Sequence, residues 1–383
     1  MNALAAPLAA LPALLPDIAA AAVRHDRDGS FPHDSLALLR NAGLPGLTVP
    51  AALGGGGAGL RLAAEAVTQL GAACPATALV LAMQYIKHAA LAQSPAWPAA
   101  LRQRVQRDAV TGGALINALR VEPELGSPTR GGLPATVARR TAEGWLVSGH
   151  KRYSTGIPGL RWLEVHGRTD EAEPRIGTFL VPAEAPGIEI VETWDHLGLR
   201  ASGSHDVLFR NVPIPAGHAI GLAAPGAGAG PDATQMAWNT VLVTAVYTGV
   251  ARAARDWTIG FLHARKPSNL GAPLATLVRV QESIGQVEGL IAANARIAEA
   301  LALATDASQP PSIAESGALK VVLADNAVRT VELCTLLAGN HAHDRANPLE
   351  RHWRDVQCAR MHAPAADAAH LAAGRAALAE RAP

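Results

Sequence analysis

The stretch Thr136–Thr155, TVARRTAEGWLVSGHKRYST, lies where the spacing of apolar residues changes from helical to short alternating runs. Within it, Ala142-Glu-Gly144 is typical of a tight turn, and TVAR and WLVS on either side are typical of strands. Further short runs rich in β-branched residues follow, separated by Pro and Gly: Ile176–Val181, Ile188–Val191 and Val207–Val212. These features predict a small all-β domain.

Helical spacing occurs on both sides of this β-domain. From about Leu14 to Arg107, apolar residues recur three and four positions apart. After a linker rich in Gly, Ala and Pro, Gly221–Gly230, the pattern predicts four helices: Ala237–Arg265, Val280–Thr305, Ile313–Leu337 and Pro348–Ala379. A chain of 383 residues is too long for one compact core. We expect three domains: helical over residues 1–110, β over residues 111–220, and a helical bundle over residues 221–383.

The composition excludes several classes of partner. Hydrophobic residues make up 49% of the chain and charged residues 17%, which is enough apolar material for a packed core. The formal net charge is +1, and no run of Lys or Arg forms a stripe. Nucleic acids and anionic membrane surfaces are therefore not expected as partners.

The N-terminus and the cysteines bear on localisation. The first 22 residues are apolar, but the first charged residue is Asp17 and three prolines interrupt the run, so it lacks the basic start of a signal peptide. We expect a leading segment followed by the first helix, and no membrane span. The three cysteines show no CxxC spacing, which argues against a disulfide framework or a structural zinc site. A cytoplasmic protein is expected.

Five local motifs occur in order along the chain. They are Gly46–Pro50 with Gly54-Gly55, Glu122–Ser127, Gly149–Thr155, Leu197–Ser202 with Phe209–Pro215, and Pro348–Asp355. Together they resemble the acyl-CoA dehydrogenase superfamily across nearly the whole chain. The resemblance implies an α+β fold with an N-terminal helical domain, a central small β-barrel or sandwich and a C-terminal four-helix bundle. It also implies a flavin cofactor, FAD or FMN, and a homotetramer built as a dimer of dimers.

The same resemblance implies a set of cofactor-binding residues: Tyr153, Thr155, Glu122, Ser127, Arg265 and Gly339. Tyr153 and Thr155 are two apart, so from a strand they would point the same way toward the flavin ring. Arg265 would reach the pyrophosphate of FAD in a neighbouring subunit, although a solvated cation at a helix end is an equal alternative. The residues after Arg265 depart from the family pattern, which leaves FAD or FMN open.

The resemblance also locates the base of a dehydrogenase, a Glu that removes the proton α to a thioester. In most relatives this Glu stands eight residues after the position of Asp355, which is Ala363 here. In a minority it stands in the first helix of the bundle, near Asn239 here. Neither residue is a carboxylate, which argues against dehydrogenation.

His362 stands beside the vacant base position. The segment around it resembles the two-component flavin monooxygenases of the superfamily, of the dibenzothiophene monooxygenase kind, in which a His at this place lies close to the flavin. We therefore predict three catalytic residues. His362 would stabilise a C4a-hydroperoxyflavin or move its proton, Thr155 would lie near flavin N5, and Asn117 would line the substrate side. The alternative is that His362 is a packing residue in its helix.

The implied reaction uses O₂ and reduced flavin from a separate NAD(P)H-dependent reductase, and transfers one oxygen atom to a small S-, N- or aromatic substrate. Two alternatives stay open: a divergent acyl-CoA dehydrogenase and a catalytically silent family member. Gly54-x-Gly56-x-x-Gly59 matches a dinucleotide fingerprint in form, but no acid lies between Glu65 and Asp108, so we interpret it as a turn between helices. The pair His341 and His343 is not expected to bind a metal.

Overall fold

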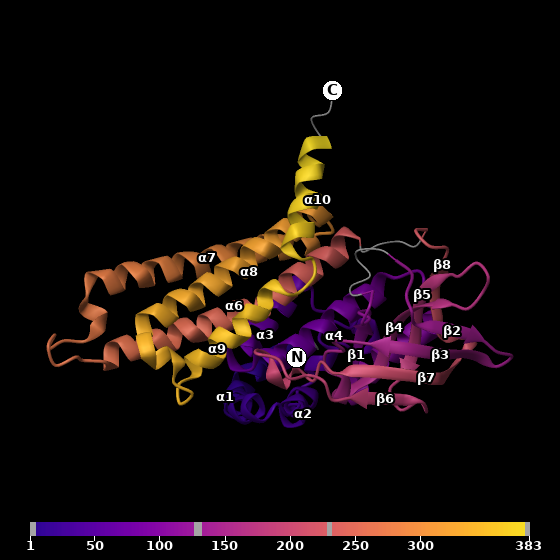
Figure 1. The fold of residues 1–383 in the computed structure, drawn as a ribbon, viewed down its shortest axis with the longest axis horizontal. Helices are drawn as coiled ribbons and strands as arrows, with labels where there is room; N and C mark the ends of the chain where they lie inside the picture. Colours follow the sequence, from indigo (N-terminus) through magenta and orange to yellow (C-terminus); the bar gives the residue numbers. More distant parts are fainter. Residues whose placement is uncertain (1–4, 126–131, 228–231, 380–383) are drawn as a thin grey trace.

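The N-terminal part of the molecule is helical, as predicted. The structure, a computed structural model, describes residues 5–125, 132–227 and 232–379 (Figure 1). The helices of this part are α1 (Ala5–Asp28), α2 (His33–Asn41), α3 (Leu60–Ala73), α4 (Pro75–Gln93) and α5 (Ala99–Gly112). The segment with the dinucleotide-like glycines lies between a short 3₁₀ turn, Ala51–Leu53, and α3, with no strand before it among the described residues. The interpretation as a turn between helices is confirmed.

Helix α1 differs from the prediction at its start. It begins at Ala5 and contains Pro12 and Pro16, so the described residues include no separate leading segment. Among the described residues, one helical stretch, Ala6–Asp28, is long and apolar enough to cross a membrane, judged by length and composition alone. In the fold, Leu11 and Ile18 are fully buried and the helix packs against α3. This packing offsets the cost of two prolines in a helix interior.

The middle part forms a single mixed sheet. Its strands are β1 (Leu115–Leu119), β2 (Val137–Arg140), β3 (Gly144–Lys151), β4 (Leu160–Thr169), β5 (Ile176–Pro182), β6 (Ile188–Val191), β7 (Asp206–Pro215) and β8 (Ala219–Ala223). They run in the order β6-β7-β3-β2-β4-β5-β8, and β1 pairs in parallel with β4. The predicted hairpin of β2 and β3 and the three later strands are confirmed. The prediction missed β1 and β4 and assigned Gly221–Ala223, the end of β8, to a linker, because Gly221 weakens the strand pattern.

The C-terminal part is a bundle of long helices that lies beside the sheet and over α3 (Figure 1). It contains α6 (Ala233–Ala264), α7 (Val278–Asp306), α8 (Ile313–Ala338), α9 (Pro348–Gln357) and α10 (Ala366–Ala379). The last predicted helix was wrong, because two helices separated by residues 358–365 replace it. Pro364 lies in this break, and proline lacks the N–H that an uninterrupted helix would need there. The order helical, β, helical is confirmed, whereas the boundaries near residues 110 and 220 stay a prediction.

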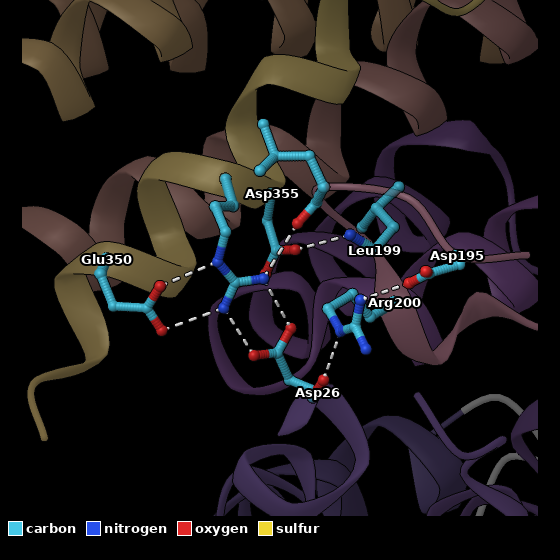
Figure 2. A network of polar contacts seen from close by, with 8 residues as sticks. Asp26, Asp195, Leu199, Arg200, Glu350 and Asp355 are labelled. Atoms are coloured by element: carbon cyan, nitrogen blue, oxygen red, sulfur yellow. Dashed lines mark hydrogen bonds and ion pairs between the residues drawn. The ribbon is translucent and has the colours of Figure 1, made fainter. Parts of the chain in front are cut away.

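Arg354 of α9 joins the N-terminal and C-terminal parts in the polar network that includes the labelled Asp26 and Glu350 of Figure 2. Its guanidinium donates to both carboxylate oxygens of Asp26 at 2.6 and 3.0 Å and to both of Glu350 at 2.8 and 3.0 Å. It also donates to the carbonyl oxygen of Leu197, in the loop before β7. The fork geometry of Arg matches two carboxylates and a carbonyl at once, so this side chain fastens all three parts of the molecule together.

The neighbouring residue Asp355 adds a second tie to the β-domain. Its Oδ1 accepts the backbone N–H of Leu199 at 2.7 Å. Asp355 is buried, and burial raises its pKa to about 6 although the N–H of Leu199 acts in the opposite direction. This helix start therefore ties α9 to the β-domain through Asp355, while the pair of Arg354 and Glu350 braces α9 itself.

A buried histidine in α4 predicts a pH-dependent stability. His88 is completely buried, both ring nitrogens lack a partner in the described parts of the chain, and burial lowers its pKa to about 3. A depressed pKa means that unfolding takes up a proton, so stability is full above pH 6.5 and falls as the pH drops toward 3. In His88→Met this loss should be absent. We therefore expect its free energy of unfolding to fall less steeply with decreasing pH than that of the wild type, by about 1.4 kcal/mol per pH unit.

The measurement is urea unfolding of both proteins at several pH values between 4 and 7. His343→Met, a change at an exposed residue, is the matched control and should leave the slope of the unfolding free energy against pH as in the wild type. An unchanged slope in His88→Met would show that the ring of His88 is not buried as described.

Candidate functional site

Asn117 and Thr155 meet where β1 approaches the end of β3. Asn117 lies in the middle of β1 and is buried, with its Nδ2 donating to the backbone carbonyl of Thr155 at 3.0 Å and its Oδ1 accepting the N–H of Ala118. The hydroxyl of Thr155 accepts a hydrogen bond from Ser204 Oγ at 3.0 Å. The structure therefore brings together two of the three predicted catalytic residues, and Asn117 holds the backbone on which Thr155 is carried.

Tyr153 is not in a strand, contrary to the prediction. β3 ends at Lys151, and Tyr153 has a φ of +55°, a conformation that a bulky residue adopts at an energetic cost. Tyr153 and Thr155 are therefore not displayed side by side on one strand face. The ring of Tyr153 is 46% exposed and meets the rings of Trp194 and His196 edge-on, while Trp194 and His196 stack at 3.8 Å. The result is an aromatic surface open to solvent.

Glu122 is buried and contacts Lys151, the last residue of β3. Its Oε1 accepts from Lys151 Nζ at 2.6 Å and from the hydroxyl and N–H of Thr136, and its Oε2 accepts the N–H of Ala135. Both Glu122 and Lys151 are buried, and these donors keep the pKa of Glu122 below its ordinary value although burial acts against them. Glu122 thus holds the start of its loop to β2 and β3. Ser127, further along the same loop, lies outside the described residues.

Arg265 and Gly339 lie at the opposite end of the bundle from Asn239. Arg265 follows α6 directly and is exposed, and Gly339 ends α8 with a φ of +59°. The two helix ends are neighbours, because Phe261 and His341 have ring centroids 5.1 Å apart. Along α6, Asn239 and Arg265 are separated by roughly 39 Å at 1.5 Å per residue. Arg265 and the break after α9 therefore belong to different regions of one subunit.

His362 lies in the break between α9 and α10, not in a helix as predicted. Its Nε2 is 2.5 Å from the hydroxyl of Tyr247, a fully buried residue of α6. Burial, together with the positive charge of Lys320, lowers the pKa of His362 to about 4, so the ring is neutral at neutral pH. Burial also holds the pKa of Tyr247 well above its ordinary value, so its hydroxyl keeps its proton. The pair can hold or pass a proton at the imidazole.

The two positions that a dehydrogenase would use for its base are in direct contact. Asn239 Nδ2 donates to the backbone carbonyl of Ala363 at 2.9 Å, although the residues are 124 apart in the sequence. The contact runs through the backbone carbonyl of Ala363 and places these two predicted positions next to each other. An amide and a methyl group occupy the place, and neither can remove a proton from carbon at neutral pH.

Sequence reasoning missed Tyr247 and Lys320. Lys320 Nζ donates to the carbonyl oxygens of His362 at 2.6 Å and Pro364 at 3.3 Å, and the side chain is 1% exposed. A signal existed for Lys320, because it is a lone charge in the apolar run Gly317-Ala-Leu-Lys-Val-Val-Leu. Tyr247 stands within a continuous apolar stretch, and nothing local distinguishes it from a core residue.

A cleft of about 720 Å³ lies elsewhere, between α2, α5 and β4. Three arginines line it, Arg40, Arg104 and Arg161, and Arg161 pairs with Glu184 at its edge. None of the predicted site residues lines this cleft. Among the described residues, no group of three or more His, Cys, Asp or Glu side chains could hold a metal ion, and His341 and His343 lie in a short 3₁₀ turn.

The region around Thr155 fits a flavin in its chemistry. A flavin ring needs a flat apolar surface and hydrogen-bonding groups at its polar edge. The ring face of Tyr153 and, roughly perpendicular to it, the stacked pair Trp194 and His196 each offer a flat surface, and Thr155 supplies a hydroxyl nearby. The hydroxyl of Ser154 is buried and has no partner in the described parts of the chain, so the region holds an unused polar group.

Comparison with known proteins identifies the family. The N-terminal, middle and C-terminal domains of acyl-CoA dehydrogenase match residues 15–93, 120–212 and 241–381. The putative acyl-CoA dehydrogenase YdbM of Bacillus subtilis is 32% identical over 349 residues, which cover 90% of this chain and 89% of that protein. The chain belongs to the acyl-CoA dehydrogenase family. The predicted fold is thereby confirmed.

Other relatives of this chain carry names that refer to a reaction other than acyl-CoA dehydrogenation. The amino sugar nitrososynthase RubN8 of Streptomyces rubradiris is 30% identical over 370 residues, covering 91% of this chain and 84% of that protein. The structure of KijD3 in complex with FMN and dTDP-3-amino-2,3,6-trideoxy-4-keto-3-methyl-D-glucose has a TM-score of 0.86 at 30% identity, covering 99% of this chain and 94% of that chain. Acyl-CoA dehydrogenases and amino sugar nitrososynthases are thus both among the relatives of this family member.

Proposed function

We propose that this member of the acyl-CoA dehydrogenase family is a flavin-dependent monooxygenase rather than a dehydrogenase. One observation carries the proposal: Asn239 and Ala363 occupy the two base positions and touch each other, while His362 stands next to them. Neither of these two described residues carries a carboxylate that could remove the proton α to a thioester. The neighbouring imidazole and phenol, in contrast, can hold the proton that oxygen chemistry requires.

In this proposal each residue has a definite task. Reduced flavin, when bound, supplies the two electrons that O₂ needs. His362 holds or moves a proton at the reacting oxygen. Tyr247 holds the imidazole in position through the hydrogen bond between its hydroxyl and Nε2. Thr155 presents its hydroxyl to the polar edge of the ring, and Asn117 fixes the backbone of Thr155 and lines the substrate side.

We assign flavin binding to Tyr153 and Thr155 at the ring and, by the resemblance, to Glu122 and Ser127 of one loop, of which Ser127 lies outside the described residues. Glu122 acts through the loop, because its carboxylate contacts are with the protein. Arg265 lies roughly 39 Å along α6 from Asn239, with Gly339 at the same end of the bundle, and by the resemblance we assign both to the cofactor tail of a neighbouring subunit. FAD has such a tail, and FMN would leave this end of the bundle unused.

The relatives suggest the kind of substrate. RubN8 is named as an amino sugar nitrososynthase, and KijD3 was solved with FMN and an amino sugar nucleotide. By similarity to these proteins we propose that a small amine is oxygenated, with sulfur and activated aromatic carbon as alternatives. A separate NAD(P)H-dependent reductase would supply the reduced flavin, and the cytoplasm would be the compartment.

We also propose a homotetramer. Leu336 of α8 and Leu371 of α10 are 72% and 54% exposed, which leaves apolar surface on the bundle for other subunits to cover. Leu333, also on α8, is buried in the core and plays no part in this surface.

Divergent acyl-CoA dehydrogenation is the second candidate, because YdbM carries that name at 32% identity. It requires a base at a position other than Asn239 and Ala363. A thioester substrate would then reduce the bound flavin in the absence of oxygen, which a monooxygenase substrate cannot do.

The test is rapid mixing of the protein, loaded with dithionite-reduced FMN or FAD, with oxygenated buffer. We expect an oxygen-dependent transient in the flavin absorbance before full reoxidation, and oxygenated product when amine substrates are present. A parallel anaerobic series mixes the oxidised holoenzyme with a panel of acyl-CoA thioesters. Bleaching of the flavin by a thioester, with no transient in the oxygen experiment, would contradict the proposal and favour the dehydrogenase.

A further inference from the structure

The segment from His362 to Pro364 is fastened by side chains from two helices. Asn239 of α6 donates to the carbonyl of Ala363, and Lys320 of α8 donates to the carbonyls of His362 and Pro364. Three successive carbonyl groups of a non-helical segment therefore each have a side-chain donor. Carbonyls in such a turn lack the partners that a helix would give them, so these donors determine where the segment lies.

Lys320 is an unusual residue for this task. Its side chain is 1% exposed, and its recorded partners are two carbonyl oxygens and no carboxylate in the described parts of the chain. The nearest acid on its own helix, Asp325, is half-exposed and pairs with Arg360 at 2.8 Å. Burying an ammonium group without a counter-ion is costly, and the position would be cheaper to fill with an apolar residue. Burial lowers the pKa of Lys320 to about 8, so the side chain is charged below that pH.

The hydroxyl of Tyr247 specifies the state of the imidazole that faces it. Tyr247 is fully buried and keeps its proton, and within the described residues His362 Nε2 is the acceptor that the structure gives it. When the hydroxyl donates, Nε2 accepts and cannot carry a hydrogen, so the hydrogen of the neutral ring then stands on Nδ1. The Nδ1–H is then a donor directed away from Tyr247.

We propose that Lys320 is a positioning residue that holds the carbonyls of His362 and Pro364 and thereby keeps the His362 ring against Tyr247 as the neutral tautomer with its hydrogen on Nδ1. The inference rests on the proposed function, because it assigns the donor atom, Nδ1–H, that His362 would offer to the reacting oxygen. The ammonium charge next to the segment opposes a second proton on the ring. Lys320 does not touch the substrate side in this arrangement and acts through His362.

The test observes the ring of His362 directly, in protein without flavin. The ¹⁵N resonances of labelled histidine are recorded between pH 5.5 and 8, with His362→Gln to assign the signals. We expect the wild-type ring to stay neutral with its hydrogen on Nδ1. In Lys320→Met we expect both tautomers, and a proton affinity of the ring about tenfold or more above that of the wild type. Lys266→Met, a change at an exposed lysine after α6, is the matched control and should leave the signals unchanged.

Two outcomes would overturn the proposal. One is a wild-type ring that is charged at pH 6.5 or carries its hydrogen on Nε2, which needs no variant and therefore holds even if Lys320→Met fails to fold. The other is a folded Lys320→Met whose His362 signals match those of the wild type. Lys320→Gln, which keeps a donor without the charge, separates the two roles: it should keep the tautomer but raise the proton affinity. Because no flavin is present, these results are independent of whether the oxygen experiment succeeds.

Discussion

Replacement of His362 by alanine is expected to lower the rate of product formation about 100- to 10,000-fold, which is the range for loss of a positioned acid or base. The loss should appear in kcat more than in KM, because the imidazole is proposed to act on the reacting oxygen and not on the substrate. Turnover of the amine substrate with a saturating supply of reduced flavin measures both constants.

The control for this prediction is His370→Ala, eight residues further on and exposed on α10, which should keep the wild-type rate. Thermal unfolding of both variants separates catalysis from folding, since His362→Ala also deprives Tyr247 of its partner, at a cost of about 1–3 kcal/mol. A folded His362→Ala with full turnover would remove His362 from the reaction and return it to the role of a packing residue.

Removal of the Arg354 side chain is expected to have the largest effect on stability. Arg354→Ala leaves Asp26 and Glu350, both less than 20% exposed, without their shared cation and removes a tie to the β-domain. Breaking a partly buried ion pair by deleting one partner costs about 3–5 kcal/mol, because the other charge stays behind. We expect the free energy of unfolding in urea to fall by that amount.

A matched surface pair provides the control. Arg360 pairs with Asp325 at 2.8 Å, but both side chains are close to half exposed, so Arg360→Ala should cost at most about 1 kcal/mol. Arg354→Lys keeps the charge without the fork and should recover only part of the loss. Equal effects of Arg354→Ala and Arg360→Ala would mean that the junction of Figure 2 contributes no more than an ordinary surface pair.

The site predictions were best where they depended on a motif and weakest where they depended on a conformation. Asn117 and Thr155 were predicted together, and the structure joins them by a hydrogen bond. The prediction that Tyr153 stands in a strand was wrong, since β3 ends two residues earlier and Tyr153 takes a left-handed conformation. Strand propensity favours an aromatic residue without showing where the strand stops, which depends on its pairing partner.

The same distinction explains the error at His362. Residues 348–379 have good helix formers throughout, and Pro364 is the one local sign of a break. Where the chain leaves the helix, and what its free carbonyls bind, is decided by Lys320 and Asn239 on two other helices. The sequence could therefore indicate that His362 has a role, but it could not indicate the protonation state or tautomer of its ring.

The order of residues alone specified the succession of helical, β and helical parts and the family, because periodicity, turn residues and short motifs are local properties of the chain. Only the tertiary structure placed Asn239 against Ala363, Tyr247 against His362, and Lys320 beneath the break, since these pairs are 124, 115 and 42 residues apart. No local pattern encodes such contacts. They arise when packing of the bundle buries polar groups that must then find partners in one another.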